Sequence, residues 1–430
     1  MALEASTDRA QETAPSMLAG VGCRLIRYYF SGAGWAEADS LPMPFNIQYA
    51  CFHPRLPIAY IACSNGGVAT PGDRHCLVQV QWNGARMAIV GDPVPLPYRP
   101  LHAMVHPREE YLALAYNRPA AVTFHHLNQH GLAAEARCLA QGDDLVGYFP
   151  HQIIPLPGCD DLLLTCRGDD ATASSAENPG SLRILRYDGR TVRGVQTIAP
   201  NGGYGFGPRN CAFHPKGHAL YAVLERQNRL AAFRIHRGTI DAEPAWSLDL
   251  LQQSGAKHRP QLGGAIAVDG SGQYAYIVNR AHPLPPAPGL AAPCGENSLV
   301  AYRLGDVTGE PREAQRVALC GLHARGMALS QDGQLLVAAF RQPGRVLLDD
   351  ATVREYAAGF ASFQIEASGE LKLGRQQTLE VGDAQLFWAD ILPFRAGQAA
   401  SLGESADDAH GAAKTDTRAR LPAGSRHRFS

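Results

Sequence analysis

The 430-residue sequence carries almost no net charge and has no long hydrophobic run. Its formal charge of −1 at pH 7 gives no general attraction to nucleic acid or to an anionic membrane surface. No window approaches the roughly 20 apolar residues that a membrane-spanning helix requires. We therefore expect neither a nucleic acid nor a membrane as a partner.

Several motifs of metal binding and catalysis are also missing. The ten cysteines are scattered and form no CxxC pair, which argues against a zinc site. No GxSxG nucleophile elbow is present, so Ser-His-Asp catalysis has no support. The first 20 residues include acidic residues and lack the apolar core of a secretory signal. We expect reduced cysteines, no metal or other cofactor, and a cytoplasmic location.

What the sequence does contain is one pattern that occurs six times. Each unit is a short apolar strand, a turn that often reads HP or DG, and a second strand rich in Leu, Val, Tyr or Ala. The units are residues 46–65, 100–117, 150–169, 208–225, 263–280 and 324–341. A third strand follows each unit, at residues 77–82, 120–127, 181–187, 229–235, 298–304 and 360–365.

The spacing of these units predicts the fold. Equivalent turns lie 53 residues apart between His53 and His106, about the size of one four-stranded propeller blade. A seventh blade begins in "AQLFWADILPF" (384–394), and "CRLIRYYF" (23–30) can complete it, which removes the last open sheet edge. We predict an all-β, seven-bladed β-propeller with N- and C-terminal strands closing one blade. A pair of β-sandwiches, the alternative, does not explain a repeat near 50 residues.

The chain divides into three segments. Residues 22–395 form the predicted propeller. Residues 1–21 and 396–430 are polar, small and poor in aromatics, so we expect both to be disordered. Residues 283–297 are rich in proline and predict a surface loop between strands. Because a closed ring leaves no sheet edge to pair, we expect a monomer.

Charged residues recur where the first strand of a unit begins and where the second ends. Neighbouring strands are antiparallel, so these two positions lie at the same end of the propeller. Arg209 begins one first strand and Glu225 ends the next strand, which places both at one mouth of the central channel. The same rule adds His102, His151 and Arg325 at strand starts, and Asn65, Asn117, Arg167, Asp169, Arg280 and Arg341 at or near strand ends.

Such a ring suits a small anion with several oxygens. The arginine fork matches carboxylate and phosphate groups, and histidine can exchange a proton near neutral pH. Opposing donors can also stabilise an oxyanion during acyl transfer. Structural interpretations remain for single residues, since Glu225 could simply be an arginine's partner and Asn117 could cap a strand. The turn histidines His53, His106 and His214 are expected to be structural.

At this point the sequence resembles a known family. The segment "GFGPRNCAFHPKGHALYAVLE" (205–225) is similar to the "GxGPRH…HPxGxxxYxxNE" signature of the seven-bladed lactonase family. Three further blades resemble that family in the same order, at residues 150–170, 265–281 and 324–342. The family includes bacterial cycloisomerase-type 6-phosphogluconolactonases and fungal 3-carboxy-cis,cis-muconate lactonizing enzymes.

The resemblance implies a metal-free lactone site on one face of the propeller. A histidine, two arginines and a glutamate are the family's proposed active-site residues, and their matches here are His151, Arg209, Arg280 and Glu225. The predicted substrate-binding residues are Arg325, on another family motif, with Arg167, Asn117 and Asn210. This chain has Asn210 where the signature has histidine, and Leu224 where it has asparagine.

Three functions are compatible with these residues. The first is a lactonase that hydrolyses a sugar-acid lactone, with 6-phosphogluconolactone as the leading substrate. The second is a cycloisomerase of a carboxylated muconate, in which the proton moves to or from carbon. The third is a non-catalytic propeller that binds a protein or a small acid. For the first two, the expected partner is a small anionic lactone or carboxylate.

Overall fold

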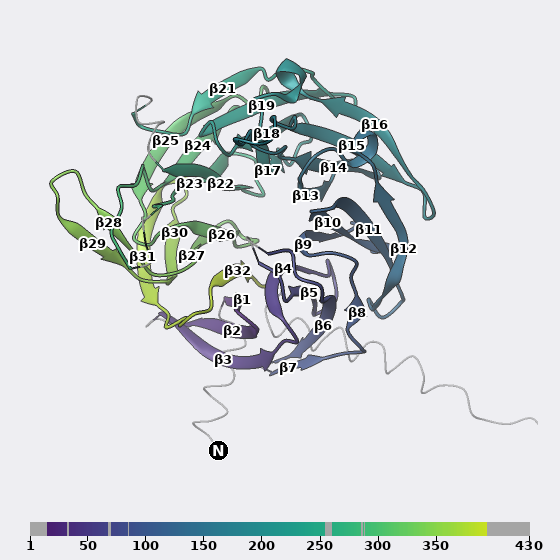
Figure 1. Cartoon of the computed structure of the whole chain (residues 1–430), viewed down its shortest axis with the longest axis horizontal. Coiled ribbons are helices and arrows are strands. Elements are labelled where there is room, and N and C mark those ends of the chain that lie inside the picture. Colours follow the sequence, from purple (N-terminus) through teal and green to yellow (C-terminus); the bar gives the residue numbers. More distant parts are fainter. Residues whose placement is uncertain are drawn as a thin grey trace, which may run out of the picture.

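The computed structural model describes residues 15–393, except for 32–33, 68–69, 85, 254–259, 285–286 and 288. Seven antiparallel sheets are arranged as blades around a central axis (Figure 1). Neighbouring blades touch through their innermost strands around a complete ring. The predicted all-β, seven-bladed propeller is confirmed.

Each blade is a path of strands from the axis to the rim. The innermost strands are β32 (Leu386–Ile391), β4 (Asn46–Phe52), β9 (Pro100–Val105), β13 (Pro150–Pro155), β17 (Pro208–Phe213), β22 (Gln261–Val268) and β26 (Ala324–Leu329). The second strands are β1 (Ser16–Val21), β5 (Ile58–Ser64), β10 (Tyr111–Asn117), β14 (Asp161–Cys166), β18 (Ala219–Leu224), β23 (Tyr274–Ala281) and β27 (Leu335–Phe340).

The outer half of each blade completes the path. The third strands are β2 (Arg24–Ser31), β6 (His75–Asn83), β11 (Ala120–Leu127), β15 (Ser181–Tyr187), β19 (Arg229–His236), β24 (Ser298–Leu304) and β30 (Gly359–Ile365). The rim strands are β3 (Gly34–Pro42), β7 (Arg86–Ile89), β8 (Val94–Pro95), β12 (Ala133–Gln141), β16 (Val192–Ile198), β20 (Thr239–Ile240), β21 (Trp246–Asp249), β25 (Pro311–Ala318) and β31 (Leu371–Thr378). Two short helical turns, α2 (Asp143–Val146) and η1 (Pro200–Gly203), lie in connecting segments.

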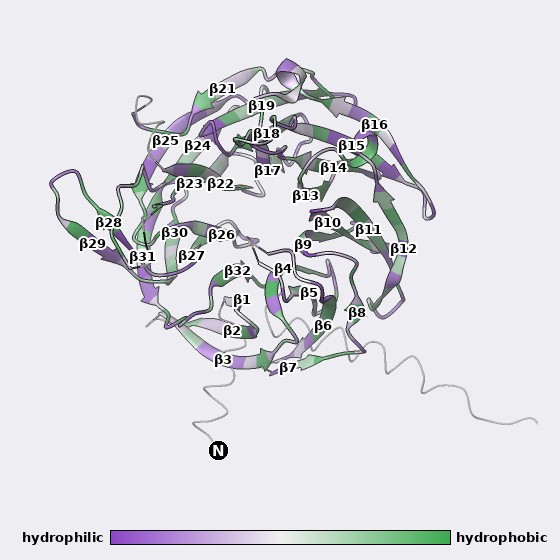
Figure 2. Cartoon of the chain, viewed as in Figure 1, coloured by the Kyte–Doolittle hydropathy of each residue, from purple (hydrophilic) through white to green (hydrophobic). Residues whose placement is uncertain are grey.

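Burial explains why the middle strands lack an alternating pattern. Every residue of β5, β10, β14 and β18 is buried, because each blade is covered on both faces by its neighbours. Rim strands such as β16 and β31 expose most of their residues, and Figure 2 shows hydrophilic residues along them. The apolar core is therefore a series of clusters between blades.

The HP turns serve the structure, as expected. The ring nitrogen Nδ1 of His53 accepts hydrogen bonds from the backbone N–H groups of Arg55 and Leu56, at 3.1 and 3.0 Å. His106 and His214 bind the backbone two residues further on in the same way. Each imidazole thus fixes the turn between the first and second strands of its blade, at the end opposite to the predicted site.

Strands from both chain ends close the ring. β32, near the C-terminal end, pairs with β1, and β1 pairs with β2. Closure by both termini is thereby confirmed, but the direct partner of β32 is β1 rather than the strand at 23–30. The expected N-terminal boundary at residue 21 is wrong, because Ser16–Val21 is a strand. The run SMLAGV has small residues and little β-propensity, yet it buries Met17, Leu18 and Ala19 between β32 and β2.

Two further features concern the segments outside the repeats. Residues 1–14 and 394–430 lie outside the described residues, so the predicted disorder of both ends stays a prediction. A hairpin that the sequence analysis did not anticipate, β28 (Gly344–Leu347) with β29 (Val353–Tyr356), projects from the ring (Figure 1). Ala292, in the proline-rich insertion, forms a parallel bridge to Val346 of this hairpin.

The burial of the closing strand β32 predicts that shortening one of its side chains will destabilise the fold. Leu386 of β32 is fully buried in the cluster between the closing blade and its neighbour. We expect Leu386→Ala to lower the free energy of unfolding by about 2–5 kcal/mol, since it removes buried methyl groups and leaves a cavity. Urea unfolding measures this loss. Leu373→Ala on rim strand β31, where the side chain is 52% exposed, is the matched control and should change stability by less than about 0.5 kcal/mol. Equal losses in both variants would contradict this account of the closure.

Candidate functional site

The same local irregularity occurs within the first five residues of every innermost strand. In each of the seven blades the register between the first and second strands shifts there, so that extra residues bulge from the first strand. A bulge of this kind re-aims a side chain. The residues at the shifts are Gln48, Leu101, His151, Arg209, Gly264 with Ala265, Arg325 and Phe387.

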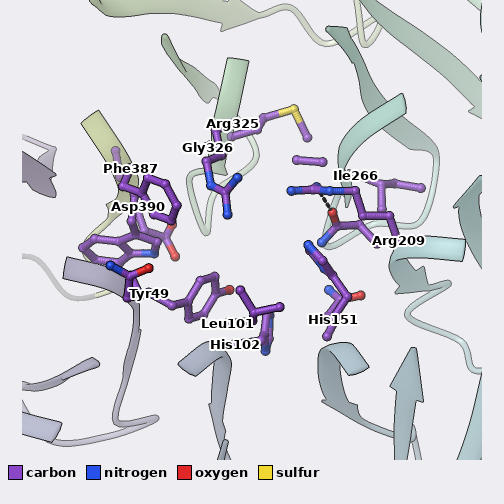
Figure 3. A pocket seen from close by; sticks show the side chains of 17 residues that line it. Tyr49, Leu101, His102, His151, Arg209, Ile266, Arg325, Gly326, Phe387 and Asp390 are labelled. Atoms are coloured by element: carbon purple, nitrogen blue, oxygen red, sulfur yellow. Dashed lines mark hydrogen bonds between the residues drawn. The ribbon is translucent and has the colours of Figure 1, made fainter. Parts of the chain in front are cut away.

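These bulges surround one cavity on the propeller axis. Its volume is about 130 Å³, and every bulge contributes to its wall. In Figure 3, Phe387 and Asp390 lie on one side of the cavity. Arg209 and His151 lie on the opposite side, and Arg325 points inward between the two groups. The remaining wall comes from Gln48, Tyr49, Leu101, His102, Gln152, Asn210, Ala265, Ile266, Gly326, Met327, Trp388 and Ala389.

Arg325 is the unpaired cation of this cavity. Its guanidinium carbon lies 3.9 Å from the centre of the Phe387 ring, and no described residue forms an ion pair or a hydrogen bond with its side chain. Burial, followed by the charges of Arg209 and Arg341, lowers the pKa of Arg325. An anion in the cavity would raise the pKa of Arg325 again, because it would neutralise a charge that the protein leaves uncompensated.

A second group of charges lies beside the cavity and shares Arg209 with it. One oxygen of Glu225 is 2.8 Å from Nε of Arg209 and 2.6 Å from a terminal nitrogen of Arg280. The other oxygen is 3.3 Å from Arg167. Burial opposes ionisation of Glu225, but the three guanidinium groups outweigh it and lower the pKa of this carboxyl. Glu225 is therefore ionised at neutral pH and pairs with three arginines.

Glycines in β22 make room for the Arg280 side chain. A Cβ on Gly264 would lie 2.9 Å from the carbonyl oxygen of Val278 and 3.1 Å from Cγ of Arg280. The carbonyl of the preceding residue, Gly263, accepts a hydrogen bond of 2.9 Å from Arg280. These contacts leave Arg280 only 1% exposed, so it supports the site from behind its wall.

The two histidines of the cavity are neutral at pH 7. Burial, and then the charge of Arg209, lowers the pKa of His102 to about 3 and that of His151 well below its ordinary value. The Nδ1 atom of each ring has no hydrogen-bond partner among the described residues. The His102 ring lies 4.2 Å from that of Tyr49. Both imidazoles can therefore form hydrogen bonds to a bound molecule without adding positive charge.

Seven of the eight predicted site residues fall into two groups. His151, Arg209, Asn210 and Arg325 line the cavity. Glu225, Arg280 and Arg167 form the adjoining ion-pair group. Asn117 is buried at the end of β10 and does not line the cavity. The roles of all eight in binding or catalysis remain predictions.

Sequence reasoning missed most of the cavity wall, including Tyr49, Phe387 and Asp390. Tyr49 and Phe387 belong to apolar strands, where an aromatic side chain predicts core. Asp390 was more conspicuous, since it is the one charged residue of "LFWADI" in β32. A carboxylate inside an apolar strand was a usable signal. Among the described residues, no cluster of three or more His, Cys, Asp or Glu side chains could hold a metal ion.

Comparison with known proteins identifies the family. A model of the family described as "Lactonase, 7-bladed beta-propeller" matches residues 65–348, which is more than half of the chain. The chain belongs to this lactonase family. The matched range covers His151, Arg209, Glu225, Arg280 and Arg325. It stops before the closing strand β32.

Three proteins that are similar to this chain share little sequence identity with it. The 6-phosphogluconolactonase of Bacillus subtilis is 24% identical over 158 residues, which is 37% of this chain and 40% of that relative. The chain thus aligns with less than half the length of that curated protein. The periplasmic gluconolactonase of Pseudomonas aeruginosa shares the fold, with a TM-score of 0.65 and 17% identity over 87% of this chain and 99% of that one. A Bacteroides uniformis protein, provisionally named a 6-phosphogluconolactonase, gives a TM-score of 0.66 and 15% identity over 88% of this chain and 100% of that one.

The Glu225 network predicts a pH-dependent loss of stability. Glu225→Gln would leave buried arginines without their carboxylate, so we expect a loss of about 3–5 kcal/mol at pH 7. The folded-state pKa of Glu225 lies below its ordinary value of 4.5. The carboxylate therefore stabilises the fold fully above that ordinary value, and this contribution disappears as pH falls through the folded-state pKa. Urea unfolding at neutral and acidic pH should show the deficit of the variant shrinking in acid.

The control for this prediction is Glu110→Gln. Glu110 is half exposed and pairs with Arg108 at the surface, where an ion pair contributes little. Its removal should leave the unfolding free energy nearly unchanged at both pH values. A Glu225→Gln deficit that is equally small would mean that the three arginines do not depend on this carboxylate.

Proposed function

We propose that this protein hydrolyses 6-phosphogluconolactone to 6-phosphogluconate. The observation that carries the proposal is Arg325, an unpaired guanidinium that faces a cavity on the axis of a lactonase-family propeller. Arg209 and Asn210 also line this cavity. The arginine fork matches phosphate and carboxylate oxygens, and the channel holds more positive than negative charge. The names of the Bacillus and Bacteroides relatives support the phosphorylated substrate.

The geometry supports hydrolysis in the following way. Water adds to the lactone carbonyl carbon, and the negative charge that develops on the carbonyl oxygen is stabilised by a guanidinium group. The ring C–O bond then breaks, and its oxygen takes up a proton. Neutral His151 can hydrogen-bond the water or the substrate. Glu225 has both oxygens bound to arginines and a lowered pKa, so in this scheme it positions Arg209 and does not accept the proton.

Two other functions remain as outcomes of the test. A carboxylated muconate would also match the arginines, and its conversion would form a lactone instead of opening one. A non-catalytic propeller would bind the acid with no chemical change.

The described residues include no helix with the length and hydropathy needed to cross a bilayer. The cytoplasmic location and the monomeric state expected from the sequence stay predictions, and one relative of the same fold is named as periplasmic.

The first test compares two lactones and one variant. We expect hydrolysis of 6-phosphogluconolactone well above its spontaneous rate, and weaker acceleration of gluconolactone, which lacks the phosphate. Arg325→Gln should lower kcat/KM for the phosphorylated lactone by roughly 10–100-fold, because it removes a charge-assisted hydrogen bond of about 1.5–3 kcal/mol. Initial rates corrected for the spontaneous reaction measure both effects.

Arg345→Gln is the matched control. Arg345 lies on the projecting hairpin, where it pairs with the exposed Glu355. Its loss should leave kcat/KM unchanged. Failure to accelerate either lactone would reject the proposal and direct the search to muconate-derived lactones, with product analysis to separate ring opening from ring closure. Binding of 6-phosphogluconate without any turnover would favour a non-catalytic propeller.

A further inference from the structure

The cavity contains a second acidic residue whose surroundings differ from those of Glu225. Asp390 lies on β32, the innermost strand of the closing blade, and lines the cavity. Figure 3 shows it across the cavity from Arg209 and His151. Among the described residues that line the cavity, it is the only acidic one. It lies outside the part of the chain that the family model matches.

The two carboxyl groups have opposite partners. Glu225 binds three arginines, whereas no cation among the described residues lies within ion-pair distance of Asp390. The one hydrogen bond that the Asp390 side chain accepts comes from the backbone N–H of Ile391, at 2.9 Å. An oxygen of Asp390 thus remains free to exchange a proton with a molecule in the cavity.

The groups that face Asp390 do not favour its ionised form strongly. β32 packs against β1, β4, β26 and β27. Of these strands, β1 and β27 have no titratable side chain, β4 contributes Tyr49 and Cys51, and β26 contributes Arg325. Burial raises the pKa of Asp390 to about 7. Burial, and then the negative charge of Asp390, raises the pKa of both Tyr49 and Cys51. Asp390 therefore exchanges protons near neutral pH, while Glu225 does not.

We propose that Asp390 is the general base that activates water in this site and the general acid that protonates the leaving oxygen. This inference rests on the proposed lactone hydrolysis and adds a catalytic residue to it. When the surroundings of two carboxyl groups push their pKa values apart, one group stays ionised at neutral pH and the other can carry a proton. His151 is the weaker base, because burial and the neighbouring arginines keep its pKa low.

The proton balance of the step is complete. The Asp390 carboxylate removes one proton from water as the oxygen of that water bonds to the lactone carbonyl carbon. The tetrahedral intermediate collapses with cleavage of the ring C–O bond. The carboxylic acid of Asp390 then gives its proton to the departing ring oxygen, which becomes the product hydroxyl. Water and lactone are consumed, a hydroxy acid forms, and Asp390 returns as a carboxylate.

The test is the pH dependence of the corrected rate in parent and variants. In the parent, kcat/KM should rise with pH through an apparent pKa near 7 and then level off, since only the Asp390 carboxylate accepts the proton. Asp390→Asn keeps the shape of the side chain but should lose at least about 100-fold in kcat, together with that rise. Asp390→Glu should retain the rise at a reduced rate. Asp306→Asn removes an exposed carboxylate that pairs with Lys216 and should match the parent.

The outcomes separate this inference from the proposed function. If the parent accelerates neither lactone, the proposed function fails and this inference fails with it. If the parent is active and folded Asp390→Asn keeps both the rate and the pH rise, the inference alone is overturned. Should Asp390→Asn not fold, Asp390→Glu decides. A proton carrier predicts that the rise moves to a different apparent pKa at a reduced rate, whereas a purely structural role predicts that the apparent pKa of the parent is unchanged.

Discussion

Closure of the ring by β32 is the constraint on which the rest of the structure depends. A propeller blade buries its apolar faces only between two neighbours, so an open ring would expose the faces of the first and last blades as well as a free strand edge. Pairing of β32 with β1 provides the seventh blade from both ends of the chain. The seven bulged strand starts then meet around one axis, and only a closed ring brings them together.

The chemical character of the cavity wall depends on which residue occupies the bulge in each blade. Where the bulged residue is Leu101 or Phe387 the wall is apolar, and where it is His151, Arg209 or Arg325 the wall is polar or charged. Burial of several arginines would be costly without compensation. Glu225 compensates Arg209, Arg280 and Arg167, and the charge of Arg325 is left for a ligand. The channel is thus stable without a ligand, and the anionic substrate that we propose would compensate the charge of Arg325.

The sequence predicted most of this architecture, because the repeat reports directly on strand pairing. The strands at 120–127, 181–187 and 298–304 have the predicted bounds. The antiparallel rule also placed Arg209 next to Glu225, which the 2.8 Å contact confirms. The strand SMLAGV could not be predicted, since its small residues become a strand only through pairing on both sides. The bulges were also beyond prediction, because a register shift depends on the partner strand. Without knowledge of the bulges, the sequence could not show that the side chains of Arg280 and Asn117 do not line the cavity.

The position of Asp390 links closure to chemistry. A carboxyl group that exchanges protons near neutral pH must be shielded from bulk water, as the half-buried Asp390 is, yet it must not meet a cation that would fix its charge. β32 satisfies both conditions, since it is the innermost strand of a blade, and β1 and β27 beside it carry no titratable side chain. Arg325 reaches the same cavity from β26 but stacks on Phe387 instead of pairing with the carboxyl. If the ring opened, water would reach Asp390 and its pKa would return toward the ordinary range for an aspartate. The proton carrier that we propose would therefore exist only in the closed propeller, on the strand that closes it.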